Sequence, residues 1–471
     1  MTVPMTFHRT NSAPATLLIA AAMLAGCEAT PTSPPSQRVA VDGDADLRAS
    51  PPDFSPIPHV VTADIQAGIE HYIAEQTRLG GGYFTLPFED EELRLKLVRV
   101  HTEYLSNLGP RRHFACVDLA STDGNVYDVD FFLAGDPGDM TVTETTVHKI
   151  NGRPFYLWQQ NPDRTWVRAA VDDATPALLG VVEGSDRFEF IYQATLPPLA
   201  DEARMWIPLP DSDSFQTVEV RQISAPGAQR ILTDKRFGNR VLFLELTPAD
   251  GGRTIDLRLD VERREKSTYH DGEQSPESFL ASEQRVPVND EFRLIAAEVL
   301  VGRSQNDLVR ARALYDHTID RMRYMKFGDG FGQGDAEYAS EAATGNCTDY
   351  HAYFIALARA AGIPARFAIG AAVPSDRDDG GVDGYHCWAE FYAEGQWWPV
   401  DISEADKYTA LATYYFGHHP ANRVELSRGR DLIVEPGPVS GPINFLAYPV
   451  LEVAGKPVAI KPQFGFRRLA E

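Results

Sequence analysis

The stretch that decides the fold of this chain is Gly345-Asn346-Cys347-Thr348-Asp349-Tyr350-His351, where an irregular Gly/Asn segment gives way to a predicted helix. Apolar side chains recur at helical spacing up to Ala361, and Gly362-Ile363-Pro364 ends the run. Cys347 therefore stands in the first helical turn, where unpaired N–H groups and the helix dipole stabilise a thiolate, the form of cysteine that attacks carbon. The alternative is a small buried residue that only packs at the helix start.

A predicted β-hairpin supplies two partners for this thiol. Its strands cover residues 384–392 and 396–401, with Glu394-Gly395 between them. If the turn has two residues, pairing is symmetric about it, and His386 and Asp401 become diagonal neighbours on one face. A three-residue loop would shift the register by one and place them on opposite faces.

Cysteine, histidine and aspartate in this order match a nucleophile, a base and an orienting carboxylate. His386 would take the proton of Cys347, and Asp401 would hold the imidazole tautomer. The thiolate would then attack an amide carbonyl, form a thioester and release an amine that His386 protonates. Water as the acceptor makes a protease or amidase, whereas a lysine amine makes a crosslinking enzyme.

Four motifs resemble the transglutaminase-like superfamily, whose members share a papain-like Cys-His-Asp site. In chain order these are Gly345-Asn346-Cys347-Thr348-Asp349, Ala361-Gly362-Ile363-Pro364-Ala365-Arg366, Tyr385-His386-Cys387-Trp388-Ala389-Glu390 and Trp398-Pro399-Val400-Asp401. The resemblance covers about residues 285 to 435 and implies cysteine-dependent acyl transfer without a cofactor. Hydrolysis of a peptide or protein substrate is the favoured activity; a protein-crosslinking transglutaminase and a non-catalytic binding module that keeps the fold are the alternatives.

A glycine-dense segment at 327–334 precedes the cysteine. It lacks the lysine and the strand–loop–helix setting of a phosphate-binding loop, so a mobile rim over Cys347 is expected instead. Gln333 or Tyr338 is the expected helper that stabilises an oxyanion beside the backbone N–H of Cys347.

No metal site is predicted. One set of zinc-type side chains is Cys347, His351, His386 and Cys387. Cys387 is expected to point opposite to His386 on its strand, so these four should not converge. The acidic loop between residues 376 and 383 has spacing too irregular for calcium. Outside the cytosol, Cys116 and Cys387 either form a disulfide or remain buried reduced thiols.

The N-terminus predicts export and a lipid anchor. Residues 1–26 are interpreted as a signal peptide, because Ala15–Leu24 is an apolar run too short to span a bilayer. The run ends in Leu24-Ala25-Gly26-Cys27, which resembles a bacterial lipobox and implies lipidation of Cys27; an ordinary signal peptide or an inconsequential apolar tail is the alternative. Residues 27–58 read as a flexible linker. The expected location is the extracytoplasmic cell envelope, periplasmic or at the outer membrane, attached to a membrane through Cys27.

Length and composition limit the remaining choices. The chain has 471 residues and 43% hydrophobic content, which is enough for about two to four domains. The formal net charge of −23 argues against nucleic acid as a partner, because phosphate binding requires a basic face.

The predicted fold class is α+β with several domains. An N-terminal α+β domain is expected at 59–180, a β-sandwich at 185–265, the papain-like catalytic core at 285–435 and a C-terminal extension packed back on the core at 436–471. In the first domain, spacing of apolar residues predicts one helix around Ile65–Ile73 and a second over Leu93–Leu108, followed by three or four strands. The sandwich strands are expected at 187–194, 203–208, 216–223, 241–246 and 254–263.

Overall fold

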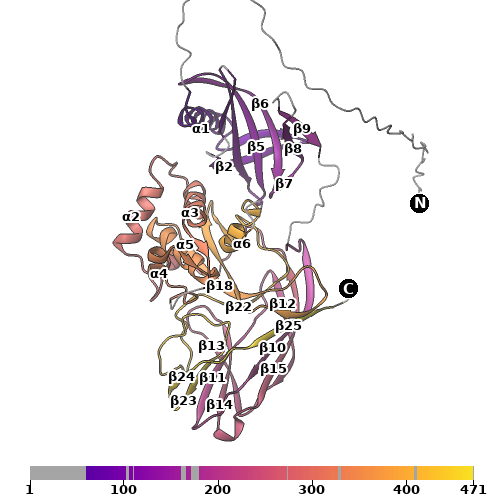
Figure 1. The fold of residues 1–471 in the computed structure, drawn as a ribbon, viewed down its shortest axis with the longest axis vertical. Coiled ribbons are helices and arrows are strands. Elements are labelled where there is room, and N and C mark those ends of the chain that lie inside the picture. The colour runs from indigo at the N-terminus through magenta and orange to yellow at the C-terminus, as the bar shows by residue number, and fades with distance from the viewer. Residues whose placement is uncertain are drawn as a thin grey trace, which may run out of the picture. The chain divides into compact units, whose positions relative to one another are not determined.

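The computed structural model describes residues 60–101, 105–109, 111–160, 166–170, 180–272, 274–326, 330–407 and 411–469. The predicted signal peptide at 1–26, Cys27 and the linker at 27–58 lie outside these residues. The described chain combines helices with several antiparallel sheets, so the α+β class is confirmed (Figure 1). Within the described ranges, no helix has both the length and the apolar character required to cross a membrane.

The N-terminal region is one helix packed on a seven-stranded sheet. Its elements are α1 (Thr62–Leu79), β1 (Phe84–Phe88), β2 (Glu91–Val100), β3 (Ser106–Gly109), β4 (Arg112–Ser121), β5 (Val126–Asp136), β6 (Asp139–Ile150) and β7 (Arg153–Pro154). The order is β1-β2-β4-β5-β6-β7, with β3 paired to β4, and β8 (Tyr156–Gln160) forms a separate pair with β9 (Trp166–Ala170). Ile65, Ile69 and Ile73 of α1 are buried in one cluster with side chains of the sheet.

The helix predicted over Leu93–Leu108 is wrong, because residues 91–100 form strand β2. Leu93, Leu95 and Leu97 pack in the α1 cluster, and so does Val100. The pairing with β4 shifts register between Leu97 and Arg99. This irregularity separates Leu97 and Val100 by three residues on one face, a spacing that imitates a helix.

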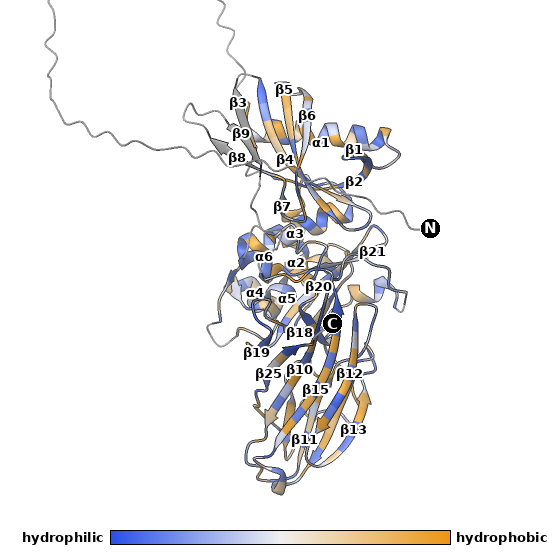
Figure 2. Cartoon of the chain, turned by 90° about the vertical axis from the view of Figure 1, so that its right-hand side faces the viewer, coloured by the Kyte–Doolittle hydropathy of each residue, from blue (hydrophilic) through white to orange (hydrophobic). Residues whose placement is uncertain are grey.

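A two-sheet β-sandwich follows. Its strands are β10 (Ser185–Thr195), β11 (Ala203–Leu209), β12 (Gln216–Ser224), β13 (Ala228–Thr233), β14 (Arg240–Leu246) and β15 (Thr254–Arg264), with 3-10 turns η2 (Pro248–Asp250) and η3 (Pro276–Leu280) after β14 and β15. All five predicted strands are present, and β13 was not predicted. The banded colouring of β12 and β15 in Figure 2 shows the alternation of apolar and polar side chains that a sandwich requires.

C-terminal strands complete both sheets of the sandwich. They are β23 (Val450–Val453), β24 (Lys456–Val458) and β25 (Gln463–Arg468). One sheet has the order β13-β14-β11-β23-β24, and the other has the order β12-β15-β10-β25-β19 (Figure 1). Strand β19 (Asp379–Val382) comes from the acidic loop that precedes His386. The end of the chain is therefore part of the sandwich, and it also holds the loop that leads to the predicted histidine.

The predicted catalytic region packs helices against a four-stranded antiparallel sheet. The elements are α2 (Asp290–Val299), α3 (Asp307–Arg321), β16 (Arg323–Tyr324), α4 (Ala336–Ala342), β17 (Thr344–Gly345), α5 (Cys347–Ala360), β18 (Ala365–Ala372), β20 (His386–Ala393), β21 (Gln396–Val400), α6 (Ile402–Lys407) and β22 (Arg423–Arg428). The sheet order is β21-β20-β18-β22. Helix α5 is buried along its length, from Cys347 to Arg359, and belongs to the same hydrophobic cluster as the sheet.

Candidate active site

The start of helix α5 is fixed by a capping box. The Asn346 side chain accepts hydrogen bonds from the Thr348 N–H at 2.9 Å and hydroxyl at 2.7 Å, and Asp349 Oδ2 accepts the Asn346 N–H at 2.9 Å. These contacts hold Cys347 as the first residue of the helix, as the sequence predicted.

Asp349 also anchors the glycine-rich segment beside the cysteine. Its carboxylate accepts the N–H of Gly332 at 2.7 Å and the N–H of Gly334 at 2.9 Å. These two amides are already occupied, so they do not form the amide cradle that a phosphate loop requires. The segment 330–334 instead borders the start of α5.

The hairpin has the register of the two-residue alternative. Ala393 pairs with Gln396 and Ala389 with Val400, while Glu394 and Gly395 both have positive φ angles, 53° and 81°, as a type I′ turn requires. His386 and Asp401 consequently meet, with 2.6 Å between Nε2 and Oδ2.

Asp401 is fully buried and remains ionised. Its Oδ1 accepts the Ser403 hydroxyl at 3.1 Å and the Glu404 N–H at 3.2 Å, so it also caps helix α6. Burial alone would raise the pKa of Asp401, but the charge and hydrogen bond of His386 outweigh it and hold the pKa well below its usual range.

Cys347 and His386 form a mutually stabilising pair. A hydrogen bond with Cys387 lowers the pKa of Cys347 well below its usual value, and hydrogen bonding and charge from His386 add to this effect against the opposing effect of burial. Burial would lower the pKa of His386, but the charge and hydrogen bond of Asp401 outweigh burial and raise it to about 9. These opposite shifts favour a thiolate beside an imidazolium.

The prediction that Cys387 points away from this group is wrong. Its sulfur lies 3.5 Å from Nδ1 of His351 on α5, and it hydrogen bonds with Cys347. Cys387 faces the helix, while His386 is the first residue of β20 and extends beyond the last β20–β21 pair, Ala389 with Val400. Both neighbours on the strand therefore interact with one thiol, although His386 is still paired with Gly370 of β18.

His351 is held as a neutral packing residue. Its Nδ1–H donates to the Cys347 carbonyl at 2.7 Å, and its Nε2 accepts the Ile402 N–H at 3.1 Å. Burial lowers the pKa of His351. Among the described residues, the clusters of metal-type ligand atoms within 4.8 Å of one another do not include Cys347, His351, His386 or Cys387.

The three cysteines that the structure describes are buried free thiols. Cys116 donates to Asp128 Oδ1 at 2.6 Å, whereas Cys387 contacts His351. Of the two alternatives for Cys116 and Cys387, the structure has the reduced one.

Gln333 and Tyr338 contact residues other than the thiol. Gln333 is exposed, and its carbonyl accepts hydrogen bonds from Asn444 Nδ2 at 2.8 Å and Arg430 Nη2 at 3.1 Å. The Tyr338 ring packs against Gly330. Within the described chain neither side chain has a hydrogen bond to Cys347, and their role at the oxyanion stays a prediction.

Tyr385 and Tyr324 were not predicted as site residues, but both interact with the surroundings of Cys347. The Tyr385 hydroxyl accepts from Asn346 Nδ2 at 2.9 Å. Parallel pairing of β16 with β17 aligns Tyr324 with Gly345, two residues before Cys347. Burial, followed by the negative charge of Cys347, raises the pKa of both phenols, so both remain protonated donors. The sequence signal that could have indicated Tyr385 is its position directly before His386.

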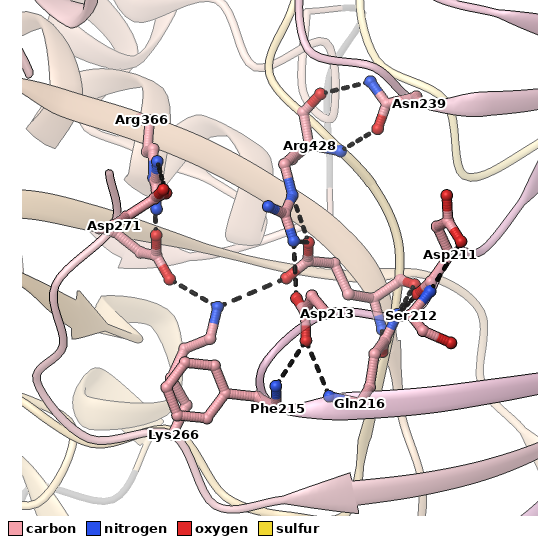
Figure 3. Close-up of polar contacts among 12 residues, drawn as sticks. Asp211, Ser212, Asp213, Phe215, Gln216, Asn239, Lys266, Asp271, Arg366 and Arg428 are labelled. Carbon is pink, nitrogen blue, oxygen red and sulfur yellow. Dashed lines mark hydrogen bonds and ion pairs between the residues drawn. The ribbon is translucent and has the colours of Figure 1, made fainter. Parts of the chain in front are cut away.

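The glutamate of the Tyr385–Glu390 motif has a structural role. Glu390 accepts from Lys266 Nζ and from Arg366 Nε, each at 2.8 Å, and Arg366 also binds Asp271 at 2.8 Å. Figure 3 shows the neighbouring Arg428, whose Nη2 lies 2.7 Å from Asp213 Oδ2.

These ion pairs lie beside a polar cleft of about 570 Å³ lined by residues of the sandwich and of the catalytic region. Burial alone would raise the pKa of Glu390, but Lys266 and Arg366 outweigh it and keep the carboxylate ionised. The network therefore joins the β18–β20 sheet to the sandwich.

Part of the chain matches known proteins. Residues 295–402 match the family model described as the transglutaminase-like superfamily. An uncharacterized protein of Haemophilus influenzae is 27% identical over 304 residues, which are 55% of this chain and 82% of that protein.

Two solved structures align with part of the chain. One, from Cytophaga hutchinsonii and provisionally described as a cysteine protease, has a TM-score of 0.40 and 16% identity, covering 61% of this chain and 99% of its own. The periplasmic domain of TgpA from Pseudomonas aeruginosa, bound to ethylmercury, has a TM-score of 0.25 and 16% identity, covering 48% of this chain and 93% of its own. The chain carries a domain of the transglutaminase-like superfamily, which supports a cysteine-dependent enzyme of papain-like type.

Proposed function

We propose that this protein hydrolyses amide bonds in a peptide or protein substrate, with Cys347 as nucleophile, His386 as general base and acid, and Asp401 as the orienting carboxylate. One observation carries the proposal. The imidazole of His386 binds Asp401 through Nε2 at 2.6 Å, and the imidazole and the Cys347 thiol shift each other's pKa toward the charged forms. Because Nε2 is engaged by the carboxylate, Nδ1 is the nitrogen that exchanges a proton with sulfur.

The reaction has two stages. The Cys347 thiolate attacks the amide carbonyl carbon, a C–S bond forms, and the carbonyl oxygen becomes an oxyanion. The C–N bond then breaks, and the Nδ1 proton of His386 passes to the departing amine. In the second stage water loses a proton to His386 and attacks the thioester, which releases the acid and regenerates the thiolate. The Cys347 N–H, with Tyr385 or the predicted Gln333 or Tyr338, would stabilise each oxyanion.

The burial of Cys347 is the observation that favours the alternative function, a non-catalytic binding module. Cys347 is only 2% exposed, and the segment 330–334 is tied to the start of its helix through Asp349. Substrate access therefore requires Cys347 to become exposed, whereas in a non-catalytic module it would stay covered. A reactivity test separates the two functions.

The first experiment measures alkylation of Cys347 by iodoacetamide across pH in the wild type and in His386→Ala. The proposed enzyme reacts rapidly at neutral pH and loses that reactivity in the variant. Equal, slow labelling of both proteins would support the binding module. The second experiment incubates the protein with a peptide library, with and without a primary amine donor, and reads the products by mass. Gain of water indicates hydrolysis, whereas amine incorporation would indicate the crosslinking enzyme.

We further propose attachment to a membrane of the cell envelope through lipidated Cys27. The lipobox-like Leu24-Ala25-Gly26-Cys27 supports this proposal. Mass spectrometry of the N-terminal peptide should find a diacylglyceryl group on Cys27, and Cys27→Ser should shift the protein from the membrane to the soluble fraction. An unmodified N-terminal peptide would contradict the anchor.

A further inference from the structure

Three aromatic rings from two distant segments of the chain gather beside the helix cap that holds Cys347. They are Tyr385, directly before His386, and Phe445 and Tyr448, in the segment before strand β23. The ring centroid of Tyr385 lies 5.0 Å from that of Tyr448 and 6.0 Å from that of Phe445. Aromatic rings attract one another at such distances. The three residues therefore form one group, which we call the aromatic cluster.

The aromatic cluster adjoins the proposed nucleophile. The Tyr385 hydroxyl accepts from Nδ2 of Asn346, the residue before Cys347, at 2.9 Å, and it lies 3.4 Å from the Gly332 carbonyl. A Cβ on Gly332 would stand 3.2 Å from Asn346 Nδ2 and 3.4 Å from this hydroxyl, so glycine lets the backbone approach the ring closely. Burial raises the pKa of Tyr448, and the negative charge of Cys347 adds to this shift. A substrate residue next to the amide that Cys347 attacks would therefore lie near these rings.

The three rings keep part of their surface accessible. Tyr385, Phe445 and Tyr448 are only partly buried and border the main hydrophobic core, whereas Tyr353 and Phe354 in that core are 0% exposed. Partly exposed aromatic rings that gather beside a reactive atom have the composition of a ligand pocket. A substrate side chain that covered them would remove apolar surface from water.

Contacts behind the rings hold the cluster in place. Asn444, the neighbour of Phe445, donates to the Gln333 carbonyl at 2.8 Å, and Arg430 Nη2 lies 2.6 Å from Asn444 Oδ1. The Phe445 ring also packs on Phe367 of β18, with 5.9 Å between their centroids. Side chains that are fixed before a ligand arrives lose little entropy when it binds. The cluster is therefore suited to discriminate among substrate side chains.

The charges around the aromatic cluster favour a neutral side chain. The fully buried Arg430 guanidinium already lies over the Phe445 ring, 5.7 Å from its centroid, and would repel a second cation there. Asp383 is exposed and stands two residues before Tyr385, so its carboxylate would repel an acidic side chain. A charged group would also lose hydration among the rings. An apolar side chain avoids all three costs.

We propose that Tyr385, Phe445 and Tyr448 form a specificity subsite that accepts a large apolar side chain, aromatic or branched aliphatic, next to the amide bond that Cys347 attacks. This inference rests on the proposed function and names the class of peptide on which it acts. Apolar pockets distinguish side chains that differ in size by roughly tenfold to a hundredfold. We expect a selectivity of this order for phenylalanine or leucine over alanine.

Epoxysuccinyl probes test the subsite without requiring turnover. The sulfur of Cys347 attacks an epoxide carbon, a C–S bond forms, and the C–O bond breaks to give a hydroxyl group after protonation. Each probe carries one variable residue on one or the other side of the epoxide: phenylalanine, leucine, alanine, aspartate or lysine. The rate of labelling of Cys347 is measured by peptide mass spectrometry and divided by the rate with iodoacetamide, which has no side chain to place. On one side, the phenylalanine and leucine probes should label at least about tenfold faster than the other three.

Four variants assign this selectivity to the cluster. Phe445→Ala and Tyr448→Ala should each reduce the ratio of the phenylalanine to the alanine probe to less than about threefold. Phe445→Leu and Tyr448→Phe keep an apolar surface and should retain most of it. Phe155→Ala, at a phenylalanine of the N-terminal region that is 47% exposed, is the matched control and should leave the ratio unchanged. Every ratio is taken within one protein, so a change in thiol reactivity cancels.

The outcomes separate this subsite from the proposed function. Uniform labelling by all probes, a preference for the lysine or aspartate probe, or a ratio that survives both alanine variants would overturn the subsite while Cys347 remains a reactive nucleophile. No labelling of Cys347 by the probes or by iodoacetamide at neutral pH would instead overturn the proposed function, and the subsite with it.

Discussion

Replacing Asp401 by asparagine keeps the shape of the side chain and removes its charge, which tests the proposed triad directly. Asp401 is fully buried, and its Oδ2 lies 2.6 Å from His386 Nε2. Burial alone would lower the pKa of His386, but Asp401, with a smaller contribution from Cys347, raises it from 6.5 to about 9. This shift corresponds to about 3 kcal/mol in favour of the imidazolium. In Asp401→Asn the largest raising contribution is lost while burial remains, so the pKa of His386 should fall well below 9.

The loss of the imidazolium should appear at the thiol. His386 helps to lower the pKa of Cys347, although the largest contribution is the hydrogen bond with Cys387, which the substitution leaves in place. About 3 kcal/mol is about a hundredfold in an equilibrium, so we expect alkylation of Cys347 at pH 6 to fall by roughly tenfold to a hundredfold. At pH 10 the two proteins should react at similar rates, because an ordinary thiol is then largely ionised.

The assay is iodoacetamide labelling at a series of pH values, with Cys347 quantified by peptide mass spectrometry. Asp406→Asn is the matched control, because Asp406 lies on the adjacent helix α6 and accepts the Tyr350 hydroxyl at 2.7 Å. The control should retain the pH profile of the wild type. If Asp401→Asn and the wild type share one pH profile, the reasoning about the triad is refuted.

Four further predictions concern the surroundings of the thiol. Because folding raises the pKa of His386, its stabilising contribution is complete below pH 6.5 and is lost as the pH rises through about 9. In a Cys347→Ala background, the Tm of His386→Gln should therefore approach the Tm of its parent over this interval. A constant difference in Tm would contradict the linkage. Tyr385→Phe should lower kcat on a peptide substrate roughly tenfold or more with little change in KM, and an unchanged kcat would exclude the hydroxyl from oxyanion stabilisation. Asp349→Asn should loosen the segment 330–334 and accelerate labelling by a bulky maleimide more than by iodoacetamide; equal ratios would show that this segment does not limit access. Glu390→Gln leaves Lys266 and Arg366 without their buried carboxylate and should cost about 3–5 kcal/mol in chemical denaturation, while the labelling profile of Cys347 stays unchanged.

The local signals that govern the proposed site could be read from the sequence. Gly and Asn before Cys347 indicated a helix start, and Asn346 and Asp349 form the capping box there. Glu394-Gly395 allowed two hairpin registers, and the positive φ angles of both residues fix the two-residue one. The diagonal contact of His386 with Asp401 follows from that register, so short-range turn chemistry was sufficient to predict it.

Long-range arrangements were not accessible in the same way. Cys387 was expected on the opposite face from His386, but both side chains interact with Cys347. The apolar residues of β2 imitated a helix because of a register irregularity that only pairing with β4 creates. The grouping of Tyr385 with Phe445 and Tyr448 likewise depends on the path of the C-terminal segment, and nothing in the local sequence specifies that path.

The position of His386 depends on more of the chain than the hairpin that carries it. Strand β19 lies four residues before His386 and is held by pairing with β25, in which Val382 is opposite Phe464. Strand β25 also pairs along β10 of the sandwich. The loop that leads into the histidine is therefore fastened to the sandwich by the last strand of the chain, whereas Cys347 is fixed by its own helix cap. A shift of the sandwich relative to the helix would therefore act on the imidazole through residues 383–385, and the Asn346–Tyr385 hydrogen bond and the pairing of His386 with Gly370 would oppose it. The C-terminal strands consequently belong to the positioning of the proposed catalytic pair, although no residue among them takes part in the chemistry.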